Sequence, residues 1–582
     1  MTKRAVAIVQ ARMGSGRLPG KSLRPLAGLP LAGHALFRLR QCKQLDDVAL
    51  ATTDRAEDDA LADWARAQGF VTVRGSADDV LSRYLDAARA TQADIIVRVT
   101  GDAPLVDPAL VDLLVERLRV GDVEFAAIEG RCSDCGIDPI TRDGLERLGR
   151  EVGTHPVARE HVTGYLHVDP GFLLIAQVRA TGDRFVEGAR LSVDVPADLA
   201  FFEAVYAQLG VRAPEADFLA VLALLRRDPS LLAINAAVRQ RAASETPLRL
   251  IAHVEAGATA GLGHLQRALA VATAARDRHA MDVVIASDGD DATLRRARDA
   301  GFRTMQLAAR WDALAPLVDT TKPTALLVDR RTGLDEADLD RAAASGWIVG
   351  VMDDAHARRR AARRAWYPPV AGARGLDWRG STCVVRVGWD WIPLRSGFAS
   401  SPPHERPQSP PRLLVAAGGS DPQRLLPRLV AAARLAAPTW QVDAIVGPLA
   451  TAIPAADPGV TLQRDVADPI ALLDQASLVV TAYGVFAFEA AARGVASLLV
   501  PLDTEQASSA AAFVEAGFAR AVPPRADDAS LVAAITALVA DADWRQQAGA
   551  RARDAIDGGG AARIADDLAA ALHAASSAQV AA

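Results

Sequence analysis

Short apolar runs alternate with amphipathic stretches along most of the chain. In the first part, the runs AVAIVQ, DVALATT, FVTVRG and DIIVRVTGD predict strands. The stretches DDALADWARAQG and DVLSRYLDAARAT between them predict helices. Strands that alternate with helices in this way are typical of a parallel sheet covered by helices. We therefore expect an α/β fold built from doubly wound sheets.

Two polar stretches divide this alternation into three parts. A helical region from about 211 to 241 ends in NAAVRQRAASETP, and the proline- and serine-rich SGFASSPPHERPQSPPR follows a second set of strands and helices. Such stretches are typical of linkers. We predict a doubly wound, Rossmann-like domain at 1–241, a first Rossmann-like lobe at 248–395 and a second one at 412–572.

Composition narrows the class of protein. The 582 residues are 50% apolar, carry a formal net charge of −6 and include four cysteines. This charge argues against general nucleic-acid binding, and no apolar run reaches the roughly 18–20 residues that a membrane span needs. So few cysteines in so long a chain fit a reducing compartment. We expect a cytoplasmic enzyme with no membrane span and no nucleic-acid partner.

The stretch VQARMGSGRLPGKSL, after the first predicted strand, combines glycines with three cations. Ligands of a doubly wound sheet bind at the carboxyl ends of its strands, and glycines let backbone N–H groups approach phosphate oxygens. Arg12, Arg17 and Lys21 can neutralise a triphosphate. A solvated surface turn is the alternative for this loop taken alone.

Two aspartates are predicted to follow buried strands. VRVTGDAPLVDP places Asp102 past one strand, and RLSVDVPADLAFF places Asp194 past another, with a helix starting at Pro196. A Mg²⁺ ion on a triphosphate takes one or two carboxylates in addition to phosphate oxygens. Either aspartate could instead cap a helix or a turn. The pair predicts a magnesium site at the edge of the sheet.

These stretches, together with RGSADDVLSRYLDAA and REHVTGYL, occur in an order that is typical of one family. Residues 1–240 resemble the cytidylyltransferases of the spore-coat polysaccharide type, which are relatives of the acylneuraminate and Kdo cytidylyltransferases. The resemblance implies CTP as donor, a sugar or sugar-acid acceptor, Mg²⁺ bound by Asp102 and Asp194, and catalytic roles for Arg17 and Lys21. It also implies nucleotide binding by Arg12, Gly14, Ser15, Arg17, Lys21, Arg74, Ser76 and Asp79.

The resemblance further implies an acceptor site, to which it assigns Asp138, Arg159, Glu160 and His161. The last three could instead form a salt bridge at a helix start. CGIDPI keeps Gly136 but has Ile140 where the family often has a glutamate, which leaves the identity of the acceptor open. Cys132 and Cys135 form a single CxxC, and a structural zinc site needs four ligands, so two unlinked thiols are the better interpretation.

The second half repeats the strand, glycine loop and helix in HVEAGATAGLGHLQRALAVATAA. His264 stands at the helix start, where a neutral imidazole can accept a proton, although a capping or packing histidine is the alternative. With GVMDDAHAR, LLVAAGGSDP and FEAAARGVASLLVPLDTEQ, residues 248–572 resemble the UDP-sugar hydrolases of pseudaminic acid biosynthesis, which have the glycosyltransferase-B architecture. The resemblance implies that His264 is the general base and that Asp353 and Asp354 match the paired aspartates of the family. It also implies nucleotide binding by Gly418, Gly419, Ser420 and Glu489.

The predicted diphosphate loop departs from this family. AYGVFAFE keeps Gly484 and Glu489, but bulky residues replace the family's glycine, serine and threonine, namely Tyr483, Val485 and Phe486. Small hydroxyl residues would hydrogen-bond a diphosphate, whereas apolar ones cannot. Glu505 adds a negative charge near the expected anion. This half could therefore bind a different donor, or no nucleotide.

We interpret the chain as a bifunctional enzyme of nucleotide-activated sugar biosynthesis. The hydrolase-like half would release a sugar from a UDP-sugar, and the cytidylyltransferase half would activate a product with CMP. A separate nonulosonic acid synthase is implied between these steps, and the chain could form a homodimer. The alternatives for the second half are a non-catalytic binding module and a glycosyltransferase. The arginine run ARRRAARRAW, at helical spacing, is typical of a solvated basic face.

Overall fold

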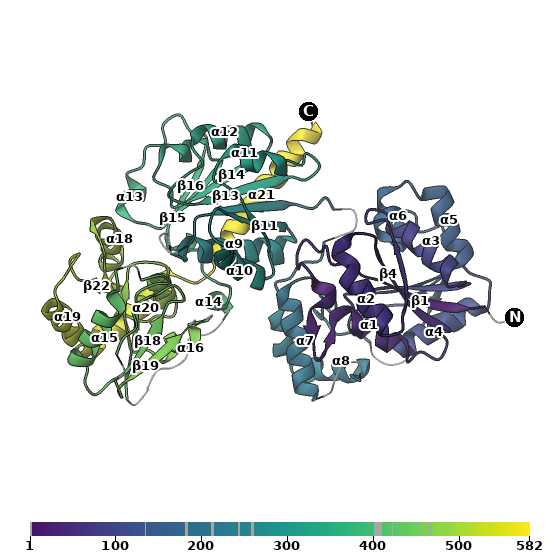
Figure 1. The fold of residues 1–582 in the computed structure, drawn as a ribbon, viewed down its shortest axis with the longest axis horizontal. Helices are drawn as coiled ribbons and strands as arrows, with labels where there is room; N and C mark the ends of the chain where they lie inside the picture. Colours follow the sequence, from purple (N-terminus) through teal and green to yellow (C-terminus); the bar gives the residue numbers. More distant parts are fainter. Residues whose placement is uncertain are drawn as a thin grey trace. The chain divides into compact units, whose positions relative to one another are not determined.

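The computed structural model describes residues 3–133, 136–180, 184–210, 215–241, 245–257, 261–400, 410–421, 423–455, 457–464, 466 and 468–581. The chain divides into two compact units, Met1–Thr246 and Pro247–Ala582 (Figure 1). The first unit contains one large sheet and the second contains two. The predicted α/β fold class is confirmed. Within the described part of the chain, no helix has both the length and the apolar character to cross a membrane.

The sheet of the first unit has seven strands in the order β5-β4-β1-β6-β8-β7-β9. In chain order they are β1 (Ala5–Gln10), β4 (Asp47–Thr53), β5 (Val71–Gly75), β6 (Ile95–Thr100), β7 (Phe125–Ile128), β8 (Ile137–Thr141) and β9 (Ile175–Val178). β1 pairs in parallel with β4 and β6, but β8 runs antiparallel to β6 and β7. The sheet is therefore mixed, which differs from the purely parallel sheet that the alternation predicts.

Helices cover both faces of this sheet. They are α1 (Leu31–Leu39), α2 (Asp59–Ala67), α3 (Val80–Ala90), α4 (Pro108–Arg119), α5 (Arg142–Val152), α6 (Pro156–His161), α7 (Pro196–Leu209) and α8 (Phe218–Arg227). Ala7 and Val9 of β1 pack with α1, α4, α7 and α8, while Val6 and Ile8 pack with α3 and α5. β1 is thus buried on both faces, and its carboxyl end delivers the glycine-rich loop to the middle of the sheet.

The first lobe of the second unit is a seven-stranded sheet in the order β12-β11-β10-β13-β14-β15-β16, and all its pairings are parallel. Its strands are β10 (Arg249–Val254), β11 (Asp282–Ser287), β12 (Arg303–Gln306), β13 (Thr324–Asp329), β14 (Ile348–Met352), β15 (Arg364–Tyr367) and β16 (Val384–Val387). Its helices include α9 (Gly263–His279), α10 (Asp291–Asp299), α11 (Trp311–Leu314), α12 (Glu336–Ala344) and α13 (Ala371–Arg374), whereas α14 (Gly397–Ser400) packs with the second lobe through Phe398.

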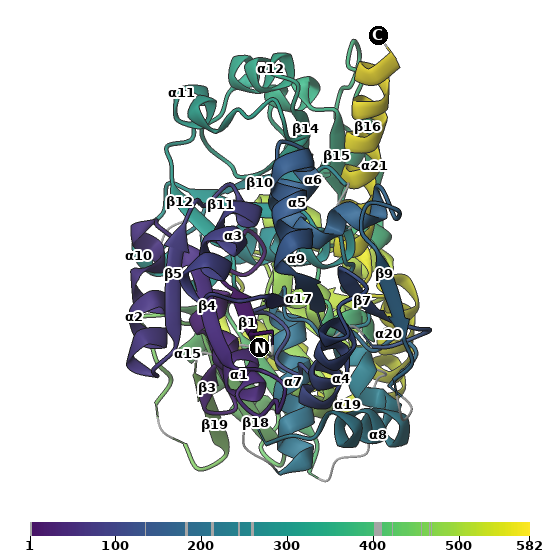
Figure 2. The ribbon, with the colours of Figure 1, turned by 90° about the vertical axis from the view of Figure 1, so that its right-hand side faces the viewer.

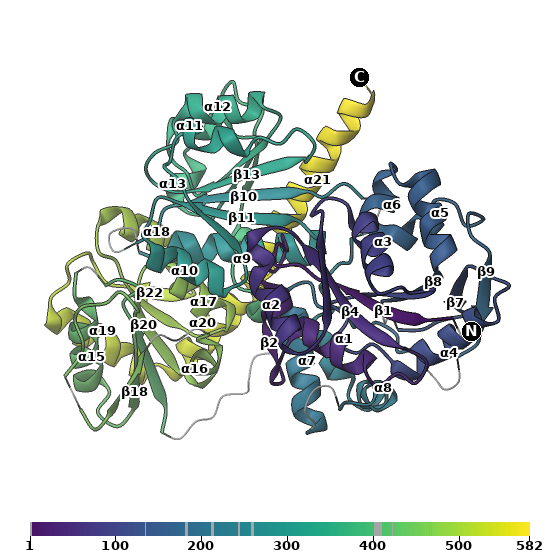
Figure 3. The same ribbon diagram turned by 45° about the vertical axis from the view of Figure 1, so that its right-hand side comes forward.

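The second lobe repeats this strand order in a six-stranded sheet, β19-β18-β17-β20-β21-β22. Its strands β18, β20 and β22 are labelled in Figure 3. Its strands are β17 (Arg412–Ala416), β18 (Gln441–Val446), β19 (Val460–Arg464), β20 (Leu478–Ala482), β21 (Ser497–Val500) and β22 (Ala519–Ala521). The helices that follow β17 along the chain are α15 (Leu425–Ala436), α16 (Ile470–Gln475), α17 (Val485–Ala492), α18 (Thr504–Glu515), α19 (Asp528–Ala540), α20 (Ala542–Ala555) and α21 (Gly560–Ala581). Two doubly wound sheets in succession give the two-lobed, glycosyltransferase-B-like architecture.

The last helix, α21, belongs to the first lobe. It lies against α9 and β14, and it is the long yellow helix of Figures 1 and 2. Ile564, Leu568 and Leu572 are buried in the core formed with β10 and α9. Asp566 also pairs with Arg278 of α9 at 2.9 Å. The second lobe expected at 412–572 therefore contains a stretch whose apolar side chains complete the core of the first.

The arginine run does not form a solvated basic face. Residues 357–361 form a short 3-10 helix, and β15 begins at Arg364. Arg358 and Arg359 are buried, because Arg358 Nε donates to Asp354 Oδ2 at 2.6 Å and Arg359 NH1 donates to His356 O at 2.8 Å. The prediction was wrong for these two residues, because their guanidinium groups also donate to the carbonyl oxygens of Leu334 and Asp377, whereas Arg360 and Arg363 are exposed.

Candidate functional site

The glycine-rich loop follows β1 and folds back on itself. Ser15 N and Gly20 N both donate to Met13 O at 2.9 Å, and Met13 N donates to Asp58 Oδ1 at 2.6 Å. Gly20 has a φ of 71°, a conformation that favours glycine. Leu18 of the same loop is fully buried. The loop is thus a structured part of the site and not a solvated turn.

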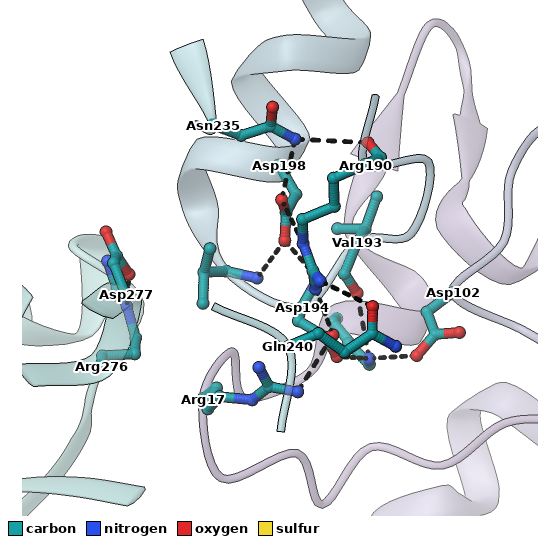
Figure 4. A network of polar contacts seen from close by, with 12 residues as sticks. Arg17, Asp102, Arg190, Val193, Asp194, Asp198, Asn235, Gln240, Arg276 and Asp277 are labelled. Atoms are coloured by element: carbon teal, nitrogen blue, oxygen red, sulfur yellow. Dashed lines mark hydrogen bonds and ion pairs between the residues drawn. The ribbon is translucent and has the colours of Figure 1, made fainter. Parts of the chain in front are cut away.

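Lys21, at the end of this loop, lies between the two aspartates predicted to bind metal. Its Nζ is 2.6 Å from Asp102 Oδ2 and 3.0 Å from Asp194 Oδ1 (Figure 4). Arg17 NH2 lies 3.0 Å from Asp194 Oδ2. The fold therefore brings together four predicted site residues that come from three separate stretches of the sequence.

The charges in this cluster determine its protonation. Burial alone would raise the pKa of Asp194, but the charges of Lys21, Arg17 and Arg190 outweigh it and hold that pKa well below its usual range. Burial would lower the pKa of Lys21, and the two carboxylates raise it above its ordinary value instead. At neutral pH Asp194 is therefore an ionised carboxylate and Lys21 a charged ammonium group.

Sequence reasoning missed the residues that support Asp194. Arg190 NH2 lies 2.5 Å from Asp194 Oδ2, and Arg190 Nε lies 3.0 Å from Asp198 Oδ1. Asn235 Nδ2 donates to the same Asp198 oxygen at 3.0 Å, and Gln240 Oε1 accepts from Arg190 NH1 at 3.1 Å (Figure 4). The only sequence signal was the position of Arg190 and Asp198, each four residues from Asp194.

The strand predicted before Asp194 is not formed, because residues 184–195 make turns and bends. Side chains take the place of a neighbouring strand: Asp194 N donates to Asp198 Oδ2 at 2.8 Å, and Arg190 O accepts from Asn235 Nδ2 at 3.4 Å. Val193 N donates to Asp102 O at 2.8 Å and joins the two aspartate segments directly. α7 begins at Pro196, as predicted.

Arg74 contacts the end of the neighbouring strand β4 and the residues that follow it. Its Nε and NH2 donate to Thr53 O and Arg55 O, both at 2.9 Å, and its NH1 lies 2.7 Å from Asp59 Oδ1. Each guanidinium nitrogen of Arg74 thus has a partner in the segment that joins β4 to α2. The contact with nucleotide that the resemblance implies stays a prediction.

Ser76 and Asp79 lie in the loop from β5 to α3. Ser76 Oγ accepts from Asp78 N at 3.2 Å, and Asp79 caps α3 by accepting from Ser82 N at 2.9 Å. Asp79 Oδ2 also lies 3.3 Å from Arg159 Nε on α6. This ion pair joins one predicted nucleotide residue to one predicted acceptor residue, which places the two segments side by side.

The other predicted acceptor residues lie on β8 and α6. Asp138 faces Arg98 of β6, whose NH1 lies 2.5 Å from Asp138 Oδ2, and Thr163 Oγ1 donates to the same oxygen at 2.8 Å. Glu160 is exposed and His161 is half-buried.

The CxxC pair is described only in part. Cys132 is half-buried, and Cys135 lies outside the described residues. Among the side chains that the structure describes, no group of three or more His, Cys, Asp or Glu is arranged to hold a metal ion.

His264 of the second unit lies in the first turn of α9, as predicted. Its Nδ1 is 2.7 Å from Asp329 Oδ1, at the end of β13. Arg267 NH2 donates to the same oxygen at 2.6 Å, and Arg267 NH1 lies 3.2 Å from Asp353 Oδ2. Burial would raise the pKa of Asp329, but Arg267 and His264 lower it below its ordinary value. The tautomer of His264 with its proton on Nδ1 would donate to Asp329 and keep Nε2 as a proton acceptor, and Arg267 NH2 also lies 3.0 Å from Nδ1.

The paired aspartates have different surroundings. Asp353 faces Arg267, whereas Asp354 is buried and accepts from His356 N at 2.8 Å and from Arg358 Nε at 2.6 Å. The hydrogen bonds of Asp354 therefore stay within the segment that follows β14.

The loops of the second lobe face the glycine loop of the first. A side chain at Gly261 would come within 3.6 Å of Ser420 Oγ, and one at Gly263 within 3.6 Å of Val485 Cγ2. Gly418 has a φ of 88° in the same turn as Gly419. Glu489 is buried and lies 2.6 Å from Arg395 NH2.

The bulky residues of the diphosphate loop pack into an apolar cluster. The Tyr483 ring lies 6.1 Å from that of Phe488 and 6.0 Å from that of Phe513, measured between centroids. Val485 and Phe486 are half-buried at the start of α17 and pack against the same cluster. Apolar packing therefore explains why Tyr483, Val485 and Phe486 occupy this loop. Of the three, only Tyr483 brings a hydroxyl donor to it.

The first unit is similar in sequence to known cytidylyltransferases. The sequence model of the family described as cytidylyltransferase matches residues 6–216. The spore coat polysaccharide biosynthesis protein SpsF of Bacillus subtilis is 33% identical over 227 residues, which are 38% of this chain and 94% of that protein. The chain belongs to the cytidylyltransferase family through its first unit and is a nucleotidyltransferase.

Two solved structures align with the two parts of the chain. A cytidylyltransferase of Leptospira borgpetersenii aligns with 40% of this chain and 97% of its own, at 29% identity and a TM-score of 0.37. MurG of Acinetobacter baumannii aligns with 55% of this chain and 99% of its own, at 16% identity and a TM-score of 0.40.

Proposed function

We propose that the first unit transfers the cytidylyl group of CTP to a hydroxyl of a sugar or sugar acid. The observation that carries this proposal is the convergence of Asp102 and Asp194 on one cation beside the glycine-rich loop. Family membership supports CTP as the donor. In the proposed reaction, the acceptor oxygen attacks the α-phosphorus, the bond from that phosphorus to the bridging oxygen of the β-phosphate breaks, and pyrophosphate leaves. The hydroxyl proton passes to solvent.

The two carboxylates fit a divalent cation. One oxygen of Asp102 and one of Asp194 already face a single positive charge, at 2.6 and 3.0 Å, and carboxylate oxygens suit Mg²⁺. Bound there with the triphosphate, Mg²⁺ would neutralise charge that develops on the phosphate oxygens. Arg17 and Lys21 would stabilise the departing pyrophosphate. The backbone of Gly14 and Ser15 would approach the phosphates, and Asp138, Arg159, Glu160 and His161 would surround the acceptor.

The test is pyrophosphate release from CTP against a panel of sugar acids and sugar phosphates. Asp194→Asn removes one ligand charge, and we expect the turnover of the folded variant to fall by at least about 100-fold, because an electrostatic contact to the reacting group is worth about 2.7–4 kcal/mol. The matched control is Asp63→Asn, which alters an exposed carboxylate paired only with Arg66. Wild-type turnover in Asp194→Asn would show that this carboxylate does not serve the reaction.

For the second unit we propose hydrolysis of a UDP-sugar, with Nε2 of His264 as the base that activates water. The hydrogen bond between His264 and Asp329, 2.7 Å long, favours this function, since it orients the ring and leaves Nε2 available. The apolar residues of the diphosphate loop favour the alternative of a non-catalytic binding module, and a glycosyltransferase is the third candidate. In the proposed pathway a separate nonulosonic acid synthase would act between the two activities.

Sugar release distinguishes these functions. The full chain is titrated with UDP, and then incubated with UDP-sugars with and without a second sugar acceptor. Binding with release into water supports the hydrolase, and release only with an acceptor supports the glycosyltransferase. Absence of UDP binding supports the module. In the first case His264→Ala should abolish release.

A further inference from the structure

Arg83 lies near the start of α3, and its buried guanidinium group has no partner in the part of the chain that the structure describes. The residue is 3% exposed, and its Nε and NH1 are buried with no hydrogen-bond acceptor among the described residues. Its neighbour Tyr84 is buried on the same helix, with its hydroxyl 3.3 Å from Ile8 O and from Val99 O. These contacts fix α3 over the ends of the central strands and so fix the direction of the Arg83 side chain.

Gly75, the last residue of β5, has no side chain and so leaves room for the side chain of Arg83 to pack closely against the sheet. A Cβ atom at Gly75 would stand 3.1 Å from Arg83 Cγ, which is closer than most real contacts of this kind. The aliphatic part of Arg83 therefore packs over the carboxyl end of β5. Ligands of doubly wound sheets bind at this edge.

The charges around the Arg83 guanidinium do not neutralise it. Burial lowers the pKa of Arg83, and the like charge of Arg12 lowers it further. Arg12 reaches the same loop, since its NH1 donates to Ala77 O at 3.3 Å. Two arginine side chains thus converge on the loop from β5 to α3.

The two carboxylates whose charges act on the Arg83 guanidinium, Asp58 and Asp79, have other partners. Asp58 accepts hydrogen bonds from Met13 N and Thr53 Oγ1. Asp79 caps α3 and pairs with Arg159 at 3.3 Å. Neither carboxylate forms an ion pair with the buried guanidinium. A buried charge without a partner is costly in a protein, so it points to a ligand that supplies the opposite charge.

We propose that Arg83 binds an anionic phosphate oxygen of the nucleotide, next to Arg12. The proposal rests on the proposed function of the first unit and adds a binding residue to it. Arginine suits this task because its planar fork donates two parallel hydrogen bonds to phosphate. Arg12 comes from the glycine-rich loop after β1, so the same phosphate group can meet both guanidinium groups.

The experiment measures binding to the full chain by calorimetry, with CTP, CMP, pyrophosphate and cytidine as probes. We expect Arg83→Met to weaken CTP binding by about 10- to 100-fold, as the loss of charge-assisted hydrogen bonds does. The free variant should melt at or above the wild-type temperature, because the substitution removes a buried unpaired charge. Cytidine binding should be unchanged. A selective loss for pyrophosphate or for CMP identifies the phosphate that is bound, and either supports the proposal.

Arg89→Met is the matched control, because Arg89 lies on the same helix but is exposed and pairs only with Asp86. It should bind all four probes as the wild type does. Wild-type CTP affinity in Arg83→Met would overturn the proposal, and so would an equal weakening of CTP and cytidine. If Arg83→Met and Arg83→Gln both fail to fold, the guanidinium supports the free protein and the proposal is wrong. A wild-type chain that does not bind CTP would instead overturn the proposed function.

Discussion

Lys21 provides the countercharge for two carboxylates in the ligand-free chain. Asp102 and Asp194 would repel each other without it, and each lies within 3.0 Å of its ammonium group. Asp194 divides its contacts: Oδ1 faces Lys21, whereas Oδ2 faces Arg17 and Arg190. Arg190 is itself held by Asp198, so Oδ2 has a fixed partner and Oδ1 is the oxygen that can exchange one cation for another.

The exchange of the Lys21 ammonium group for a divalent cation can be measured without enzymatic turnover. In the wild type, the ammonium of Lys21 and a divalent cation compete for the same two oxygens, so we expect weak Mn²⁺ binding in the absence of nucleotide. Lys21→Met leaves these carboxylates without that charge, and Mn²⁺ affinity should rise by about tenfold or more, since two charges 4 Å apart interact by roughly 4 kcal/mol near a protein surface. Electron paramagnetic resonance of free Mn²⁺ gives the affinity.

Lys43→Met is the control for this change, because Lys43 is exposed and remote from both aspartates in the sequence. It should leave Mn²⁺ affinity as it is. Equal Mn²⁺ affinity in Lys21→Met and the wild type would mean that the ammonium does not occupy the position of the metal.

At the scale of single elements, α1 carries a buried histidine that makes the first unit sensitive to acid. His34 is fully buried, and its Nε2 lies 2.8 Å from Leu26 O. Burial lowers the pKa of His34 to about 4. The unfolded chain, with an ordinary value of about 6.5, takes up the proton first as the pH falls. Stability from this group is therefore complete above pH 6.5 and is lost between about pH 6.5 and 4.

Replacing His34 should remove this pH dependence. Between pH 6.5 and 5 the wild-type first unit should lose about 2 kcal/mol of unfolding free energy through His34, whereas His34→Gln should lose that much less. Urea unfolding at the two pH values measures the difference. His167→Gln, which changes an exposed histidine, should behave as the wild type does. An unaltered pH slope in His34→Gln would contradict the assignment.

α21 is the second element whose role can be tested. Leu568 of α21 is fully buried against the first lobe of the second unit, and its Cδ2 would lie 3.5 Å from a Cβ at Gly350 of β14. We expect Leu568→Ala to destabilise the second unit by about 2–5 kcal/mol through lost burial and a cavity. Leu435→Ala, on the exposed side of α15, is the control. CTP turnover should be unaffected, and an equally stable Leu568→Ala would contradict the packing of α21.

At the scale of the whole molecule, the two proposed activities belong to two compact units with separate cores. Units of this kind fold around their own apolar side chains, so damage at one site need not reach the other. The charge clusters are also separate in sequence, since Lys21, Asp102 and Asp194 belong to the first unit and His264 and Asp329 to the second.

Paired variants test this independence. Asp102→Asn should abolish CTP turnover and leave any release of sugar from a UDP-sugar unchanged, and His264→Ala should do the opposite. Both reactions are followed in the full chain, by pyrophosphate and by reducing-sugar assays. Loss of both reactions in either single variant would show that the units depend on each other.

Much of the fold and part of the site could be predicted from the sequence. Apolar runs of strand length and the helices between them predicted the α/β class, and the start of α7 at Pro196 and of α9 near His264 followed from local signals. The cations of the glycine-rich loop and the pair of carboxylates were predicted as two separate groups, one for phosphate and one for magnesium. Their meeting at Lys21 could not be derived from spacing, because 81 residues separate Lys21 from Asp102 and 173 separate it from Asp194.

The sequence by itself determined what depends on neighbours along the chain: the alternation of strands and helices, the glycine-rich turn after β1, and the supply of charged groups at strand ends. Tertiary structure alone decided what depends on partners far away in sequence. Asn235 supports Asp198 where a strand was expected, Arg358 donates to the carbonyl oxygen of Leu334, and α21 completes a core more than 280 residues upstream. The reason is physical, since a buried charge or apolar face is stable only against its complement, and the fold alone brings that complement near.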